Sequence, residues 1–168
     1  MKHIIQSEFY PIRLMSRFVI IFWAIWTGLV LASDVINWLQ AVGWCVPETY
    51  YSSHNFDLIA KSLAPFTHNA NILLSVFGLV ILGYLINTLL FVLALFYSCN
   101  EARFSSLAWW ALFLGVFSES AFVLIDEITL QYALEQGHMD RLALRFITIG
   151  IFYLFNQVYK NNAESIRS

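Results

Sequence analysis

The 168-residue sequence has little charge, since only 12% of its residues are Asp, Glu, Lys or Arg, about half the share of an ordinary soluble domain. With 60% hydrophobic residues, a soluble fold would lack the polar surface needed to cover its core. Nine basic residues stand against eleven acidic ones, for a net charge of −2, which leaves no basic face for nucleic acid. The composition therefore excludes an independent soluble globule, a disordered tail and a nucleic-acid binder, and it favours a protein whose solvent is the lipid bilayer.

The motifs of common enzyme classes are also missing. The two cysteines, Cys45 and Cys99, form no Cys-x-x-Cys pair, and because we expect them on opposite sides of the membrane they cannot bridge to each other. The sequence has no phosphate-binding glycine loop, no Gly-x-Ser-x-Gly elbow and no His-Glu-x-x-His motif. We therefore expect no cofactor, and nothing in the sequence itself proposes an enzyme.

Four apolar stretches are long enough to cross a bilayer, which takes about 20 residues of helix. They cover residues 15–34, 71–97, 104–125 and 142–159. Their hydrophobicity is continuous rather than alternating, so helices are favoured over a barrel. We predict a single all-α integral membrane domain, built as an antiparallel bundle of four transmembrane helices.

The basic residues predict the orientation, because they accumulate in cytoplasmic flanks. With the N-terminus inside, six face the cytoplasm and three the exterior: Lys2, Arg13, Arg17, Arg103, Lys160 and Arg167, against Lys61, Arg141 and Arg145. We predict a multi-pass protein of the plasma (inner) membrane with both termini in the cytoplasm. In the alternative interpretation, the first stretch is a signal peptide cleaved after Val30-Leu31-Ala32.

Both expected outer loops carry signals of short helices. In residues 55–63, Asn55 can cap a helix, Asp57 suits its first turn and Pro65 ends it, with an apolar face typical of a helix on a membrane surface. Asn71 is a candidate cap for the second span. A second short helix is predicted over residues 128–136, with Gly137 at its end and Asp140 at the start of the next helix.

Glu119 is the most informative residue, because an ionisable side chain inside a span is costly unless it is paired. It shares a helix face with Ala111 and Gly115 at a spacing of four residues, and such small residues mark the face where membrane helices meet. Arg145 lies at a similar depth in the fourth stretch and is the expected partner. We predict a bidentate Glu119–Arg145 pair, which either fixes helix packing or serves a relay or polar ligand pocket.

Other polar residues form a second set of candidates. Four of them could make interhelical hydrogen bonds or line a polar path: Asn87, Asp34, Thr148 and Asn156. None of the histidines is expected inside an apolar span. A metal site is a weak alternative, because the outer-face candidates fit no known ligand spacing: His54, Asp57, His68 and His138.

Three functions are compatible with these features. The first is a non-catalytic accessory, assembly or regulatory subunit of a membrane complex, whose partners are the bilayer and other membrane subunits or a second copy of itself. The second is a small oligomeric ion- or proton-coupled transporter that uses Glu119 and Arg145. The third is a membrane enzyme acting on a lipid or quinone through His54, Asp57 and His68. The sequence favours the first.

Overall fold

The computed structural model describes residues 2–44 and 51–165, and within these ranges the chain is helical and contains no strand. The helices are α1 (Lys2–Ala41), α2 (Asn55–Leu63), α3 (Ala70–Phe96), α4 (Glu101–Ile128) and α5 (Tyr132–Ser165). All but α2 contain a stretch long and apolar enough to cross a membrane. The prediction of an all-helical chain with four helices of membrane-spanning length is therefore confirmed.

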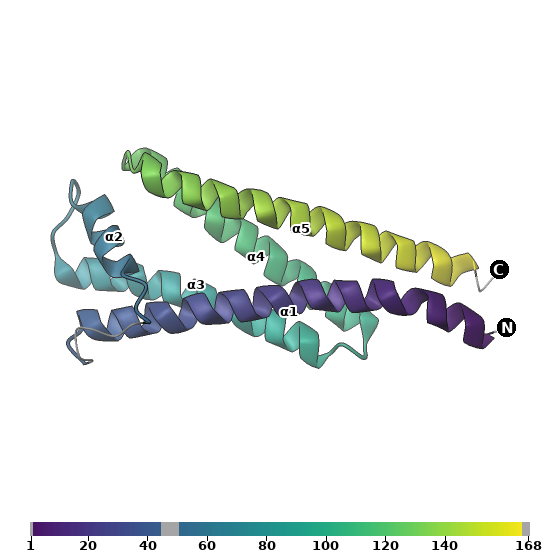
Figure 1. Ribbon diagram of the computed structural model, residues 1–168. Coiled ribbons are helices and arrows are strands. Elements are labelled where there is room, and N and C mark those ends of the chain that lie inside the picture. Colours follow the sequence, from purple (N-terminus) through teal and green to yellow (C-terminus); the bar gives the residue numbers. More distant parts are fainter. Residues whose placement is uncertain (1, 45–50, 166–168) are drawn as a thin grey trace.

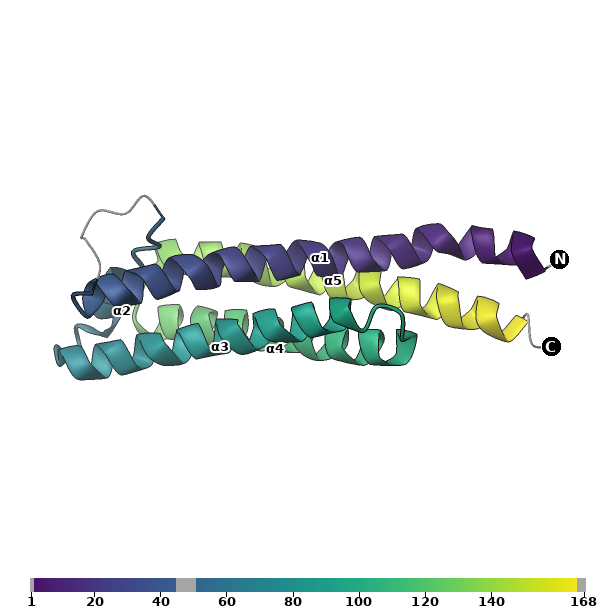
Figure 2. The same cartoon turned by 90° about the horizontal axis from the view of Figure 1, so that it is seen from below.

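The long helices lie side by side along most of their length (Figures 1 and 2). The most extensive contacts join α1 to α3, α3 to α4 and α4 to α5, while α1 and α5 touch less. Both chain ends and the α3–α4 connection lie at one end of the molecule, and α2 and the α4–α5 turn lie at the other. In Figure 1, α1 and α3 diverge from α4 and α5 toward the end that carries α2.

Three of the four apolar stretches extend further than the sequence predicts, while the second keeps its length and is displaced by one residue. The candidate spans are Pro11–Ala41, Ala70–Phe96, Glu101–Ile128 and Leu134–Tyr159. The first and last differ most, because polar residues that were expected in loops lie inside α1 and α5. Asn37, for example, lies beyond the predicted end of the first span at residue 34, but it is inside α1 and buried.

The predicted break at Gly137 is wrong. Residues 132–165 form one continuous helix, so the second outer-loop helix and the fourth span are the same element. A glycine inside a helix costs only about 1 kcal/mol relative to alanine, and Asp140 accepts a hydrogen bond from Gln136 Nε2, one turn earlier, at 2.8 Å. The turn between α4 and α5 is only residues 129–131, with Leu130 in the left-handed region (φ 57°).

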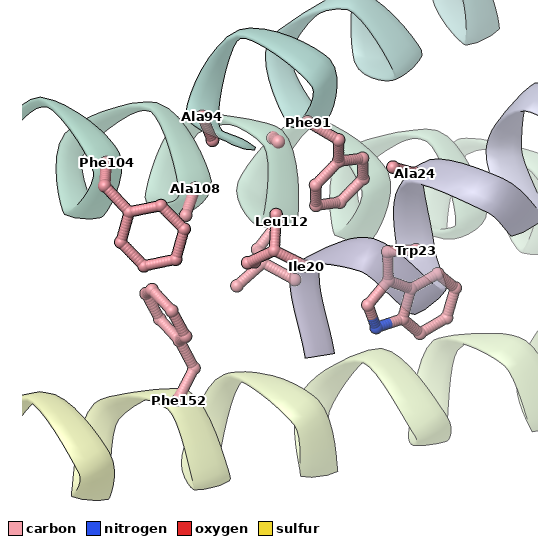
Figure 3. Packing of buried hydrophobic residues seen from close by; sticks show 10 residues of the cluster. Ile20, Trp23, Ala24, Phe91, Ala94, Phe104, Ala108, Leu112 and Phe152 are labelled. Carbon is pink, nitrogen blue, oxygen red and sulfur yellow. The ribbon is translucent and has the colours of Figure 1, made fainter. Parts of the chain in front are cut away.

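A layer of apolar side chains packs between the long helices, near the middle of α1 and α5 and the start of α4 (Figure 3). Phe104 on α4 faces Phe152 on α5 at a ring-centroid distance of 6.2 Å. The cluster draws on all four long helices and includes Ile20, Trp23, Ala24, Phe91, Ala94, Phe104, Ala108, Ala111, Leu112 and Phe152. At this level the interior between the four long helices is therefore filled by packed side chains.

Polar contacts tie the start of α4 to α1 at the same end. Arg13 and Arg17 both pair with Glu101, and Arg17 Nη2 donates to the Ser98 carbonyl at 2.6 Å. Asn100 caps α4 by accepting from the Arg103 amide. Cys99 lies exposed in this connection, whereas Cys45 is outside the described residues.

Helix α2 forms over the predicted residues, but its capping differs from the prediction. His54, in the left-handed conformation, precedes the helix, and Asn55 is its first residue. The side chain of Asn55 instead donates from Nδ2 to Asp34 Oδ1 on α1 at 2.7 Å. The cap of α3 is likewise Asn69 rather than Asn71, because Asn69 accepts from the Asn71 backbone amide at 3.0 Å.

Replacing Asn37 with alanine is expected to loosen α2. Asn37 Oδ1 on α1 accepts from the Phe56 backbone amide at 2.8 Å, so it serves as a cap from a neighbouring helix. Loss of a helix cap costs about 1 kcal/mol. Hydrogen exchange of the α2 amides should accelerate about fivefold, while the α3 amides keep their rates. Unchanged α2 exchange would show that this bond does not hold the helix in place.

Candidate binding cleft and its charge cluster

Glu119 on α4 is surrounded by basic side chains of α5. The residue is 1% exposed, and its Oε2 accepts from Arg141 Nε at 3.2 Å. His138 Nδ1 lies 3.2 Å from the same oxygen, and Arg145 Nε lies 3.9 Å from Oε1. One buried carboxylate thus faces three basic residues.

The contact between Glu119 and Arg145 differs from the expected bidentate pair. At 3.9 Å it is an ion pair without a hydrogen bond, and the hydrogen bond to Glu119 comes from Arg141 instead. The reason lies in the continuous α5 helix. Because residues 138, 141 and 145 follow one another at spacings of three and four, they share one face toward α4.

Arg145 is held mainly by packing. It is 1% exposed, its guanidinium carbon lies 4.3 Å from the centre of the Trp23 ring, and Gly115 leaves the space that its guanidinium occupies. A cation over an aromatic face is stabilised by the ring quadrupole. Trp23 is itself oriented by a hydrogen bond from Nε1 to Thr148 Oγ1 at 3.3 Å.

His138 and Asp126 extend the group toward the α4–α5 turn. The expectation that no histidine lies in an apolar span is wrong, because His138 is inside the candidate span of α5. Its Nε2 lies 3.6 Å from Asp126 Oδ2, and its ring packs on Phe122 at a centroid distance of 4.9 Å. We call Glu119, Asp126, His138, Arg141 and Arg145 the charge cluster.

Three residues of the charge cluster, Asp126, His138 and Arg141, line a cleft of about 490 Å³, within the size range of small-molecule sites. All five helices contribute to the cleft at the end of the molecule that carries α2. Its lining is Trp26, Val30, Ser33, Ser53, Asn55, Leu58, Ile59, Ser62, Leu63, Val76, Val80, Tyr84, Phe122, Ile125, Asp126, Leu134, Gly137, His138 and Arg141. The cleft is thus mostly apolar, with charged groups on the α4 and α5 wall.

The secondary candidates fall in different places. Asn87 on α3 and Thr148 on α5 are buried, and Thr148 accepts a hydrogen bond from Trp23 of the apolar core. Asp34 is buried on α1 and bonded to the cleft-lining Asn55. Asn156 lies at the opposite end, beside Arg13. The structure therefore brings Glu119 and Arg145 together and leaves Asn156 apart from them.

The metal-site candidates of the sequence fall in three places. His54 and Asp57 lie at the start of α2 and His68 lies in the α2–α3 connection, all three exposed, while His138 lies in the charge cluster. Within residues 2–44 and 51–165, no group of three or more His, Cys, Asp or Glu residues is placed to hold a metal ion.

The sequence interpretation did not connect three members of the charge cluster to Glu119. Asp126, His138 and Arg141 fall between the third and fourth predicted stretches, where His138 was only a weak metal candidate and Arg141 only a basic residue on the outer side. The spacing carries a signal that could have found them, because 119 and 126 on α4 are seven apart and 138, 141 and 145 on α5 are three and four apart. The break placed at Gly137 concealed that signal.

Comparison with protein-family models, with curated proteins and with solved structures found no match to this chain.

Proposed function

We propose that the four long helices cross the plasma (inner) membrane as an antiparallel bundle with both termini in the cytoplasm. The arrangement of the chain ends at one end of the molecule supports this topology. Arg13, Arg17 and Arg103 lie toward that end, as expected of a cytoplasmic flank. Of the basic residues expected outside, Arg141 and Arg145 pair with Glu119, so they do not oppose this orientation.

A reporter fused after Ser168 tests the orientation. An enzyme that is active only in the cytoplasm should be active at this position, and one that is active only after export should be silent. A fusion between Leu63 and Ala70, beyond α2, should give the reverse pattern. Exported activity after Ser168 would contradict the proposed topology.

The function proposed for this bundle is that of a non-catalytic accessory or regulatory membrane protein that binds its ligand in the cleft. The observation that carries this proposal is that the cleft ends on a packed layer. Beyond the charge cluster lie Ile20, Phe91, Leu112 and Phe152, each fully buried. A cleft closed by close packing favours binding over conduction, since bundle cores of this width are filled by side chains.

Flux measurements separate binding from the transporter alternative. In proteoliposomes of the full chain, we expect proton and monovalent-cation flux no greater than in protein-free liposomes, and no change in Glu119→Gln. The matched control is Glu127→Gln, an exposed acidic residue on the same helix. A wild-type flux that disappears in folded Glu119→Gln, but persists in Glu127→Gln, would replace the binding proposal with a carrier.

A further inference from the structure

The cleft combines apolar walls with a polar end. Side chains from all five helices form the apolar part, among them Trp26, Ile59, Val80, Phe122 and Leu134. These helices are long and apolar enough to cross a bilayer, apart from α2. An occupant that suits this lining carries a hydrocarbon chain, because apolar surface is the main contribution of such walls to binding.

At the polar end of the cleft, the carboxylate of Asp126 and the guanidinium of Arg141 lie at the two nitrogens of the His138 ring. Asp126 lines the cleft and is 6% exposed. Its Oδ2 has no hydrogen-bond partner among the described residues, with His138 Nε2 3.6 Å away. Arg141 also lines the cleft, contacts His138 at Nδ1 and has a 37% exposed side chain. Arg141 is therefore the most accessible charged residue of the charge cluster, and Asp126 Oδ2 is free to accept a hydrogen bond from an occupant.

Arg141 and Asp126 together suit an occupant whose head group both accepts and donates hydrogen bonds. A phosphate would accept from the Arg141 guanidinium, for which it is a good partner. A primary ammonium would donate to Asp126, whose burial makes an unmatched carboxylate costly. In phosphoethanolamine two carbons join these groups, so that one head carries both the acceptor and the donor.

We infer that the cleft binds an ethanolamine phospholipid, with its ammonium on Asp126, its phosphate on Arg141 and an acyl chain between the apolar walls. This inference rests on the proposed function, in which the cleft is a binding site. It also makes a sharp distinction between lipids. A choline head has the same charges but no N–H to donate, and a glycerol head has the phosphate without the cation.

The test measures thermal unfolding of the full chain in a mild detergent with one added phospholipid at a fixed mole fraction. Phosphatidylethanolamine should raise the Tm by about 3–5 °C, the shift expected at roughly ten times the Kd for a chain of this size. Phosphatidylcholine and phosphatidylglycerol with the same acyl chains should raise it by less than half as much. Native mass spectrometry of the same mixtures should show the same order of retained lipids.

The decisive variant is Asp126→Asn, which should lose the preference for ethanolamine over choline while still binding phospholipid through Arg141. The matched control is Asp140→Asn, an exposed acidic residue on α5 that also carries a hydrogen bond, and it should keep the preference. If Asp126→Asn does not fold, the ranking of the three lipids on the wild-type chain decides.

Equal shifts for all three lipids, or a preference that survives in Asp126→Asn, would overturn the inference. A preference for phosphatidylglycerol would also overturn it, because it would show that the cleft selects an anion. So would a co-purifying membrane protein that abolishes the ethanolamine shift, since it would be the occupant instead. These failures leave the flux result unchanged, so they differ from a failure of the proposed function.

Discussion

Replacing Glu119 with glutamine is expected to lower the free energy of unfolding by about 3–5 kcal/mol, the range for breaking a buried ion pair from one side. The substitution keeps the shape of the side chain and removes its charge. Arg141 would keep a weaker acceptor, and Arg145, which is 1% exposed, would lose its nearest carboxylate. Denaturant unfolding in detergent, followed by circular dichroism, measures the loss.

Glu127→Gln provides the control, because Glu127 is exposed on the same helix, and it should change stability by less than about 0.5 kcal/mol. Exchanging the charges in Glu119→Arg with Arg145→Glu should not restore stability. An arginine at position 119 would face Arg141 and His138, which both contact Glu119 in the native structure. Wild-type stability in Glu119→Gln would contradict the role given to this carboxylate.

Replacing Gly115 with alanine should also destabilise the protein, by about 1–3 kcal/mol, as expected for overpacking of a filled interior. A Cβ at this position would overlap the Arg145 guanidinium. That group is buried against the Trp23 ring at 4.3 Å and beside Glu119, so it has little room to move away. The same unfolding assay measures the effect.

Gly83→Ala is the matched control, because a Cβ added to Gly83 on α3 would meet no atom within 4 Å. Alanine has the higher helix propensity, so this variant should gain up to about 1 kcal/mol. If Gly115→Ala behaved like Gly83→Ala, the close approach of α4 to Arg145 would be wrong.

The four helices that are long and apolar enough to cross a membrane could be predicted from the sequence, because a helix suited to lipid needs a long apolar run. Their ends could not, because polar residues such as Asp34 and Asp140 form hydrogen bonds inside or beside the helices. Gly137 followed by Asp140 has the pattern of a helix end and a new start, yet the helix continues through it. Tertiary contacts of the flanking residues, His138 and Arg141 with Glu119, compensate for the weak propensity of glycine.

The site was predictable only where it broke the apolar pattern. Glu119 and Arg145 stand out because a charge within an apolar run is rare. Asp126, His138 and Arg141 lie near the ends of such runs, where charged residues are ordinary, so composition gives no reason to select them. The cleft itself is lined by residues of all five helices. It depends on how segments far apart in the sequence pack together, and no local sequence pattern encodes that.

A double-mutant cycle between Glu119 and Arg141 tests most directly the claim that this carboxylate holds the α5 wall of the cleft in place. The cycle compares the unfolding free energies of Glu119→Gln, Arg141→Gln, the double variant and the wild type. The account predicts a coupling of about 1–3 kcal/mol, as found for residues in one buried network. Effects that add to within about 0.5 kcal/mol would show that the two side chains do not interact, and would contradict it.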